Sequence, residues 1–388
     1  MTGLAMLIAC PEPERVELDV LNRIDELRER LRWQLHEPRR WSGSLRRLSL
    51  ARAIQGSNSI EGYDARLDDA AAVALGEDPL DVGEETQRAL AGHRDAMTHV
   101  LQLRQDEEFE HSTQLIKSLH FMMTSYSLAN RPGLWRTGQV YVQKEDTGQI
   151  VYEGADPADV PALMRALVTR LNEERSADAG HALLYGAMAH LNLVMVHPFK
   201  DGNGRMARCL QSLVLARSGL LSPVFLSIEE YLGKNTQDYY EVLARVGQGR
   251  WSPEADARPW IRFALLAHLR QAATMLRRVD ESAKLWIGME TLAAQHKLPD
   301  RCLTALFDAA SGLRVRNATY RSSLRDSGED EISFQTASRD LKSMVDAELL
   351  VATGERRNRV YTAGRDLQLL RQGIVAQRDP RDDSDPFA

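Results

Sequence analysis

Helical spacing of apolar residues over most of the chain is the feature that most restricts the fold. Between residues 14 and 35, Leu18, Leu21, Ile24, Leu27 and Leu31 recur every three or four positions, with charged residues between them. The same pattern returns in residues 45–54, 86–105, 112–128, 157–172, 181–196, 235–246 and 257–279. A chain built from such segments predicts a mainly α protein in which helices pack on helices.

Length, charge and cysteine content set the broad class. The 388 residues exceed the size at which one hydrophobic core stops growing, so about two domains are expected. A net charge of -6 and a pI near 6.0 argue against a chain coated in nucleic acid, but not against one locally basic module. Cys10, Cys209 and Cys302 are far apart and form neither a metal-binding pattern nor a disulfide framework, which favours a reducing, cytoplasmic location.

The start of the chain superficially resembles a lipoprotein signal, because "LAMLIAC" ends at Cys10. No Lys or Arg precedes this run, and it is shorter than the apolar part of a normal signal. We therefore expect no export. No other stretch is apolar for long enough to span a membrane, so no membrane partner is expected.

One β signal interrupts the helices. In residues 139–152, Val140 and Val142 alternate with polar residues, a turn sequence "DTG" follows, and Ile150 and Tyr152 continue the alternation. A single hairpin among helices cannot form a sheet core. It predicts a surface flap over residues 138–153, whose exposed edge could pair with an extended segment of a target protein or have no partner.

The pattern changes after about residue 282. Helical segments are followed by a helix over residues 333–347 and then by two short strands around a basic tip at residues 354–359, which is the element order of a winged helix. DNA could bind this module through the exposed polar and basic residues of the helix and the tip: Gln335, Ser338, Arg339, Lys342, Arg356, Arg357 and Arg359. Asp340, Asp346 and Glu348 dilute the charge, and such modules also serve as protein-interaction or dimer elements.

The stretch "HPFKDGNGRMAR", residues 197–208, carries the chemistry. Gly202, Asn203 and Gly204 lie at the predicted start of a helix, which Asn203 can cap, and glycines there let backbone N–H groups point into one anion-binding concavity. Arg205 and Arg208 follow three residues apart, so they share a helix face beside this concavity. Two guanidiniums next to such a site suit a polyphosphate.

Two further residues of this stretch supply the remaining parts of a nucleotide-transfer site. Asp201 directly precedes the glycines and could hold Mg²⁺ together with phosphate oxygens. His197 has a side chain that titrates near neutral pH and could accept a proton from an attacking hydroxyl. Each residue alone could be an ordinary loop or surface residue. Their combination within twelve residues favours a functional site.

These residues match the signature of the Fic family, H-x-F-x-D/E-G-N-G-R-x-x-R, at every fixed position, and the resemblance covers roughly residues 40 to 270. It implies a Fic helical core with a β-hairpin flap, followed here by a small winged-helix (α+β) domain. It also implies a protein adenylyltransferase that moves AMP from ATP to a Ser, Thr or Tyr hydroxyl and releases pyrophosphate. Mg²⁺ would be the cofactor and ATP the co-substrate.

The resemblance also implies a role for each residue. His197 would be the general base, and Asp201 would hold Mg²⁺. The nucleotide-binding residues would be Phe199 beneath the loop, Gly202, Asn203 and Gly204 as the anion hole, Arg205, and Arg208 on the γ-phosphate. Gly204 fits the AMP-transferring branch, because the phosphotransferase branch has Lys there. In "DYYEVL", Tyr239 and Tyr240 either contact the nucleotide or pack in the core, and Gly247 replaces an Asn that the family often has.

The upstream stretch "SNSIEG", residues 57–62, resembles the inhibitory motif S/T-x-x-x-E-G/N of the family, although it also fits a helix end with a glycine stop. Ser57, Glu61 and Gly62 would be its regulatory residues. A carboxylate can pair with a guanidinium, so Glu61 could hold Arg208 away from the γ-phosphate and turn the enzyme down. Glu61 could also help to remove AMP from a modified target.

The predicted organisation is an N-terminal helical region over residues 1–110 with the inhibitory motif at 57–62, and a catalytic core over 111–280 with the flap. A winged-helix domain over 281–370 and a disordered tail over 371–388 follow. Expected partners are a protein target and the chain itself by self-modification, and the family resemblance implies a second copy in a homodimer. Two alternatives stay open: AMP removal or transfer from another nucleotide in the same pocket, and a DNA-binding regulator whose core senses a nucleotide.

Overall fold

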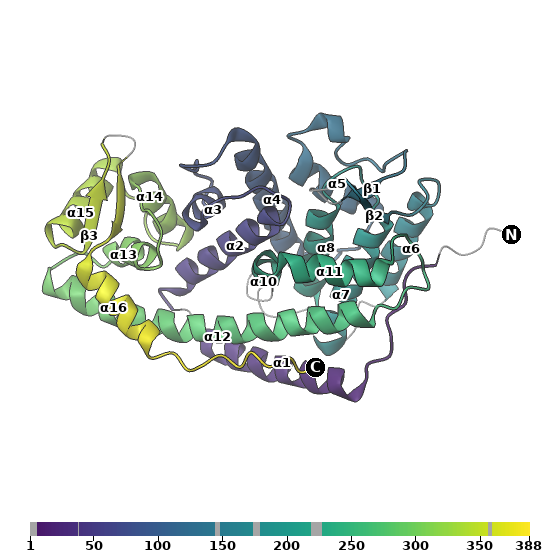
Figure 1. The fold of residues 1–388 in the computed structure, drawn as a ribbon. Helices are drawn as coiled ribbons and strands as arrows, with labels where there is room; N and C mark the ends of the chain where they lie inside the picture. The colour runs from purple at the N-terminus through teal and green to yellow at the C-terminus, as the bar shows by residue number, and fades with distance from the viewer. Residues whose placement is uncertain (1–5, 38, 144–147, 174–178, 219–226, 356–358) are drawn as a thin grey trace.

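The structure is a computed structural model that describes residues 6–388 except 38, 144–147, 174–178, 219–226 and 356–358. The mainly helical prediction is confirmed, because the described strands form only two two-stranded sheets among many helices (Figure 1). No described helix is both long and apolar enough to cross a membrane.

The N-terminal region is a set of helices that ends near the flap. Its elements are α1 (Arg15–Leu35), α2 (Ser42–Ser59), α3 (Leu67–Ala74), α4 (Glu84–Leu103), α5 (Thr113–Thr124) and the 3₁₀ turn η1 (Leu128–Asn130). Helix α2 is longer than the predicted helix over residues 45–54, and it includes Ser57. Its burial continues through Gly56, Ser57 and Asn58, so this end of the helix is part of the interior.

The flap consists of β1 (Tyr141–Gln143) paired antiparallel with β2 (Ile150–Glu153), so the predicted hairpin is present. Part of the predicted turn, residues 144–147, lies outside the described residues. The base of the hairpin is anchored: Tyr152 is buried, and its hydroxyl donates to the Met195 carbonyl at 2.7 Å.

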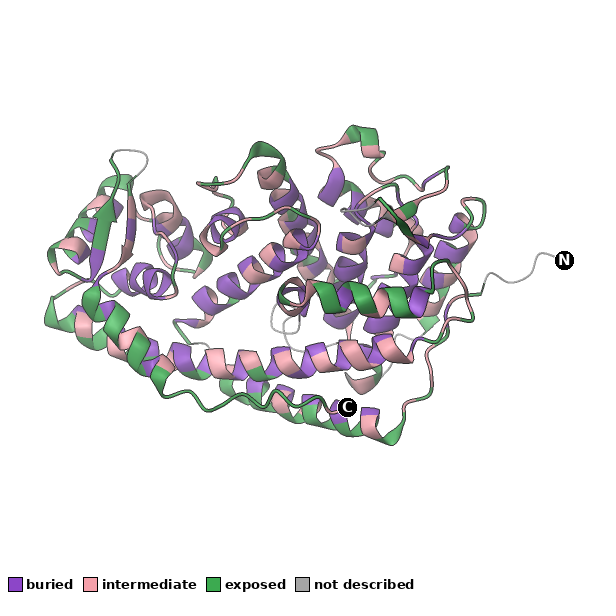
Figure 2. Cartoon of the chain, viewed as in Figure 1, coloured by how far each residue is buried: buried purple, intermediate pink, exposed green. Residues whose placement is uncertain are grey.

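Helices α7 and α8 form the centre of the next region, whose elements are α6 (Val160–Glu173), α7 (Ala179–Val196), α8 (Asn203–Arg217), α10 (Glu229–Lys234), α11 (Thr236–Gly247) and α12 (Arg258–Gln295). Almost every residue of α8 is buried, as expected for a helix surrounded by others. By contrast, α11 is green on its outward face in Figure 2 and covers the core from one side only.

Helix α12 is a single helix of 38 residues that runs along one side of the molecule, next to α1 (Figure 1). The predicted domain boundary between residues 280 and 281 therefore falls inside a continuous helix. The apolar spacing continues through Leu285, Trp286 and Met289, and these buried residues belong to the core of the C-terminal region.

We call residues 301–376 the C-terminal module. It contains α13 (Cys302–Ala310), α14 (Asn317–Asp326), α15 (Phe334–Asp346), β3 (Leu350–Thr353), β4 (Val360–Ala363) and α16 (Arg365–Ala376). Strands β3 and β4 are antiparallel, and Val315 forms a bridge to Tyr361. This is the element order on which the winged-helix prediction rests, and that assignment stays a prediction.

The C-terminal tail differs from the expected disordered segment over residues 371–388. Helix α16 continues to Ala376, and the residues after it follow α12 and α1 without forming a helix or strand (Figure 1). Asp382 pairs with Arg23 at 3.2 Å, and the Ser384 carbonyl accepts a hydrogen bond from Arg270 at 2.5 Å. These contacts tie the tail to the long helices.

Candidate functional site

The stretch "HPFKDGNGRMAR" forms the turn between α7 and α8 and the first turns of α8. Helix α7 ends at Val196, and α8 begins at Asn203, so the intervening residues make a tight loop. Gly202 has φ 74°, a left-handed conformation that glycine adopts without strain, and a Cβ there would lie 2.8 Å from the Thr124 side chain. The loop therefore needs this glycine for both its shape and its packing.

Asn203 does not cap α8 as predicted. It is the first residue of the helix, and its side-chain amide bridges the loop: Nδ2 donates to the Phe199 carbonyl at 3.0 Å, and Oδ1 accepts from the Phe199 N–H at 2.9 Å. This closes the loop on itself. The start of α8 has no side-chain cap, so its N-terminal N–H groups are available to an anion.

Phe199 is fully buried and fixes the loop from below, as expected. Its ring stacks on His120 with centroids 3.6 Å apart and the planes 1° from parallel. His120 Nδ1 accepts a hydrogen bond from the Gly133 N–H at 2.9 Å, so the hydrogen is on Nε2, which donates to the Asp201 carbonyl at 2.8 Å. Burial lowers the pKa of His120 to about 4, which keeps the ring neutral. Sequence reasoning missed His120, because nothing in its local sequence marks it.

His197 has the chemistry of a proton acceptor. Its backbone has φ 55°, and its Nδ1 lies 3.1 Å from the Val194 carbonyl. A carbonyl only accepts, so Nδ1 carries the hydrogen and Nε2 is the nitrogen that can take a proton. Burial lowers the pKa of His197 below its usual value, so the ring is neutral near pH 7.

Arg136 holds the backbone around His197, and sequence reasoning also missed it. Its Nε donates to the His197 carbonyl at 2.6 Å, and its Nη1 donates to the Gly138 carbonyl at 2.9 Å. A third hydrogen bond reaches the Ala155 carbonyl. One buried side chain thereby joins the loop of His197 to both ends of the flap. A single arginine outside any motif gives no sequence signal for such a role.

Arg205 and Arg208 are both buried on α8, which excludes the alternative of an ordinary solvated face. Arg205 Nη1 donates to the Tyr126 hydroxyl at 2.9 Å, and Tyr126 in turn donates to the Tyr63 hydroxyl at 2.9 Å. The Arg205 guanidinium also lies 5.1 Å from the centre of the Tyr63 ring. Tyr63 follows the stretch "SNSIEG" directly, so that segment reaches Arg205 as well.

Arg208 is bound by the stretch "SNSIEG". Its Nε donates to Ser57 Oγ at 2.8 Å, and its Nη2 donates to the Ser57 carbonyl at 2.8 Å and to Glu61 Oε1 at 2.7 Å. Burial acts to lower the pKa of Arg208, but the adjacent Glu61 carboxylate raises it above the usual value. The structure therefore brings together the two stretches that the sequence analysis singled out.

Asp201 is the one acidic residue of the loop, and its side chain is 40% exposed. Asn130 donates to Asp201 Oδ2 at 3.0 Å, and Arg205 lies 3.8 Å from the same oxygen. Among the described residues, no group of three or more His, Cys, Asp or Glu side chains could hold a metal by itself. One carboxylate fits Mg²⁺ when phosphate oxygens and water complete its six ligands.

Tyr239 and Tyr240 have different positions. Tyr239 is buried and donates from its hydroxyl to His190 Nε2 at 2.9 Å, and burial raises its pKa to about 12. Its ring lies 6.0 Å from the Arg208 guanidinium. Tyr240 is 46% exposed and donates to the Ile60 carbonyl at 2.9 Å, so it contacts the stretch "SNSIEG". Tyr239 is thus a core residue next to Arg208, and Tyr240 lies at the surface of the site.

Gly247 departs from the Asn that the family pattern often has, and the local packing accounts for it. A Cβ at Gly247 would lie 2.8 Å from the Tyr152 ring and 3.3 Å from Met195 Sδ. A side chain longer than that of glycine fits there only if the Tyr152 ring moves. The base of the flap therefore occupies the space that an asparagine would need.

Comparison with known proteins finds one family that is similar to this chain in the region of the site. A family model described as the Fic/DOC family matches residues 110–215. A protein adenylyltransferase Fic from Nematostella vectensis is 28% identical over 275 residues, which cover 66% of this chain and 55% of that protein. A protein of the same name from Drosophila virilis is 33% identical over 157 residues, which cover 40% of this chain and 28% of that protein. The chain thus spans about half the length of these relatives or less.

Solved structures show the same fold. The crystal structure of a Fic family protein from Desulfovibrio desulfuricans has a TM-score of 0.56 and 22% identity, and the match covers 91% of this chain and 97% of that chain. Fic-1 from C. elegans has a TM-score of 0.51 and 24% identity, with 69% and 73% covered. The Fic/DOC family model thus matches the centre of this chain, and the chain as a whole has the mainly helical Fic fold with two small β-hairpins.

Proposed function

We propose that this protein is an autoinhibited, Mg²⁺-dependent protein adenylyltransferase that moves AMP from ATP to a Ser, Thr or Tyr hydroxyl of a protein. The convergence of four groups around the start of α8 carries the proposal. They are a histidine with Nε2 as the proton acceptor, one partly exposed carboxylate, and two buried guanidiniums. The relatives named protein adenylyltransferase Fic support the reaction type.

The proposed reaction uses each of these groups. His197 Nε2 takes the proton of the target hydroxyl, whose oxygen forms a bond to the α-phosphorus of ATP. The bond between the α-phosphorus and its bridging oxygen breaks, and pyrophosphate leaves with that electron pair. Arg205 and the N–H groups at the start of α8 stabilise the negative charge that develops. Asp201 would hold Mg²⁺, which when bound neutralises phosphate charge and orients the phosphates.

The contacts of Arg208 support autoinhibition. Glu61 and Ser57 accept hydrogen bonds from its Nε and Nη2, two of the three nitrogens with which it could bind a γ-phosphate. With Arg208 occupied, ATP would bind with its α-phosphate turned away from in-line attack, and the transfer rate would fall without loss of the catalytic residues. Removal of the Glu61 carboxylate would free the arginine.

Incorporation of AMP from α-labelled ATP with Mg²⁺ tests this function, with self-modification as an acceptable readout. Three proteins are compared: wild type, Glu61→Gly, and Glu61→Gly/His197→Ala. We expect weak labelling of the wild type, strong labelling of Glu61→Gly and none of the double variant. If none labels although the wild type binds ATP, the transferase function is wrong, and a nucleotide sensor or another donor becomes the better explanation.

DNA binding by the C-terminal module is a second candidate function, favoured by the position of Asp340. This carboxylate is buried and paired with Arg301 at 2.7 Å, so it does not dilute the charge of the exposed face of α15. Arg339 and Lys342 lie on that face, although Asp346 pairs with Lys342. A gel-shift titration at two salt concentrations with wild type and Arg339→Ala tests the candidate; unchanged binding by the variant would exclude this face. A homodimer and a cytoplasmic location remain predictions.

A further inference from the structure

Helix α2 connects the C-terminal module to the nucleotide site. Its first half packs against that module, and its last turn carries Ser57, with Glu61 just beyond. The helix has 18 residues, so it spans about 27 Å. It contains no proline, and its Gly56-Ser57 pair lies in the last turn, packed against the Glu229 backbone, so the helix between Arg47 and that turn contains no residue that favours a kink.

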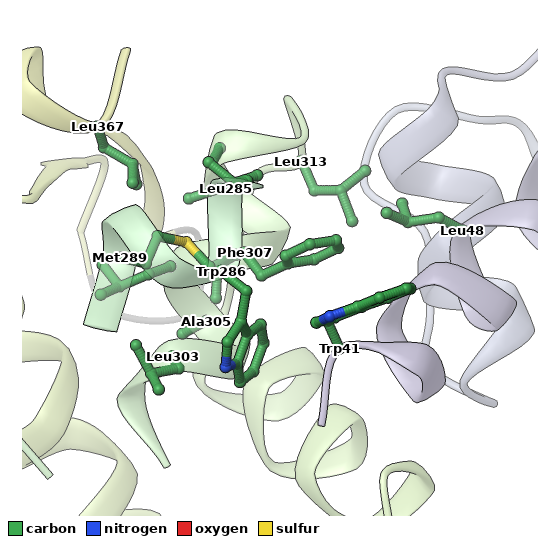
Figure 3. Packing of buried hydrophobic residues seen from close by; sticks show 14 of the residues in the cluster. Trp41, Leu48, Leu285, Trp286, Met289, Leu303, Ala305, Phe307, Leu313 and Leu367 are labelled. Atoms are coloured by element: carbon green, nitrogen blue, oxygen red, sulfur yellow. The ribbon is translucent and has the colours of Figure 1, made fainter. Parts of the chain in front are cut away.

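The first contact with the module is apolar. Trp41 and Leu48 face Phe307 and Leu313 of the module, together with Trp286 of α12, in Figure 3, and all five belong to one buried cluster. The same cluster continues into α14 and α15, so α2 is packed into the core of the module rather than laid on its surface. Displacement of the module from α2 would expose this apolar area.

The second contact is a buried ion pair. Arg47 on α2 donates to Asp308 Oδ1 on α13 at 2.6 Å, and the two side chains are only 2% and 6% exposed. Ser323 on α14 donates to the other Asp308 oxygen at 3.0 Å. A buried pair of this kind fixes the relative position of its two helices, because a shift would separate two buried charges that lie in direct contact.

The other end of α2 holds the inhibitory residues by backbone hydrogen bonds. The Asn58 carbonyl accepts from the Glu61 N–H at 3.0 Å and from the Tyr63 N–H at 3.1 Å. The Ser57 carbonyl and hydroxyl, which bind Arg208, are part of the helix itself. A shift or rotation of α2 therefore moves the groups that bind Arg208 directly.

We propose that the C-terminal module holds α2 in the position from which Ser57 and Glu61 bind Arg208. An effector that displaces the module from α2 then raises AMP transfer. This regulation rests on the proposed function, since it acts through the same arginine. It makes α2 the two-state element whose position both the module and the nucleotide site influence.

The variant Arg47→Met tests this coupling, because it removes the ion pair and keeps a long side chain. We expect faster amide hydrogen exchange at residues 58–63 in the variant than in the wild type. We also expect AMP transfer to rise at least about fivefold, the lower end of what coupling between two sites produces. Arg301→Met is the matched control. It breaks the pair with Asp340, which lies inside the module, and should change neither readout.

The outcomes separate this inference from the proposed function. Unchanged exchange at residues 58–63 in folded Arg47→Met would overturn the coupling. If Arg47→Met shows faster exchange but neither Arg47→Met nor Glu61→Gly transfers AMP, the coupling is supported and the transferase function is rejected. In the Glu61→Gly background, Arg47→Met should give no further rise, since both changes free the same arginine. If Arg47→Met does not fold, Asp308→Asn decides, because it keeps the side-chain volume and a partner for Ser323.

Discussion

Glu61 and Gly204 lie so close together that a Cβ atom on Gly204 would be 2.3 Å from Glu61 Oε1. Gly204 is in the first turn of α8, where N–H groups and the helix dipole favour an anion. The Glu61 carboxylate therefore occupies the approach to the place where the phosphates of ATP are proposed to bind. It is bound at that place by Arg208, so inhibition and phosphate binding use the same groups.

Ser57 should contribute to inhibition less than Glu61. The replacement Ser57→Ala removes one of the three hydrogen bonds that Arg208 donates, the one to Ser57 Oγ. The hydrogen bonds from Arg208 to the Ser57 carbonyl and to Glu61 remain. A hydrogen bond to a charged group is worth about 1.5 kcal/mol or more, so we expect AMP transfer to rise roughly tenfold. The rise should stay below that of Glu61→Gly, measured with labelled ATP in parallel.

Ser59→Ala is the control for this experiment. Ser59 Oγ donates to the Gly56 carbonyl at 3.0 Å within the helix, whereas Arg208 is bound by Ser57 and Glu61. It should leave AMP transfer unchanged. A rise of equal size in Ser57→Ala and Ser59→Ala would show that loosening of the helix end, rather than loss of the bond to Arg208, is responsible.

The pH dependence of transfer should follow His197. Burial lowers its pKa below the usual value near 6.5, so the ring is neutral and able to accept a proton above that pH. We expect the rate of Glu61→Gly to be level between about pH 7 and about pH 8, and to fall as pH drops through the lowered pKa. The measurement is the rate at saturating ATP and Mg²⁺. A midpoint above about pH 7 would contradict His197 as the base.

The sequence was sufficient for the mainly helical fold and for the two stretches that meet at Arg208, because helical spacing and the long motif are local signals. It was not sufficient for His120, Asn130 and Arg136, which support the loop from other elements. Their roles depend on which segments become neighbours after folding. No spacing within the chain marks a histidine that stacks on Phe199 or an arginine that caps the carbonyl of His197.

The sequence also could not show that the predicted domain boundary near residue 280 lies inside a continuous helix. The change in pattern after residue 282 is real, but it lies within α12, whose later turns are buried in a different cluster from the earlier ones. Composition detects a change of core and cannot show whether the helix itself continues. Likewise, Asp340 counts as a surface charge in the sequence and is a buried partner of Arg301 in the structure.

Stability should fall in mild acid because of His93. This residue is fully buried, and among the described residues neither ring nitrogen has a hydrogen-bond partner. Burial lowers its pKa to about 3, so below pH 6.5 the unfolded chain binds a proton that the folded chain does not. The free energy of unfolding should therefore fall by about 1.4 kcal/mol for this residue between about pH 7.5 and about pH 5.5.

The measurement is urea unfolding at both pH values for wild type, His93→Met and His296→Met. His93→Met should lose the part of the pH dependence of the unfolding free energy that comes from His93. His296→Met, which changes an exposed residue, should keep the wild-type dependence. Equal dependence in all three proteins would show that His93 is not protonated on unfolding in this range, against the cause proposed here.

Gly247 should not tolerate the asparagine that the family pattern often has. In Gly247→Asn, the new side chain meets the Tyr152 ring, whose hydroxyl anchors the flap base to the Met195 carbonyl. Overpacking of this kind costs about 1–3 kcal/mol, so the melting temperature should fall, and transfer by the Glu61→Gly enzyme should fall with it. Gly373→Asn is the control: nothing lies within 4 Å of a Cβ there, and its backbone is part of helix α16, with no positive φ that asparagine would have to adopt. A Gly247→Asn protein as stable and active as that control would show that Tyr152 is free to move, and that packing is not the reason for the glycine.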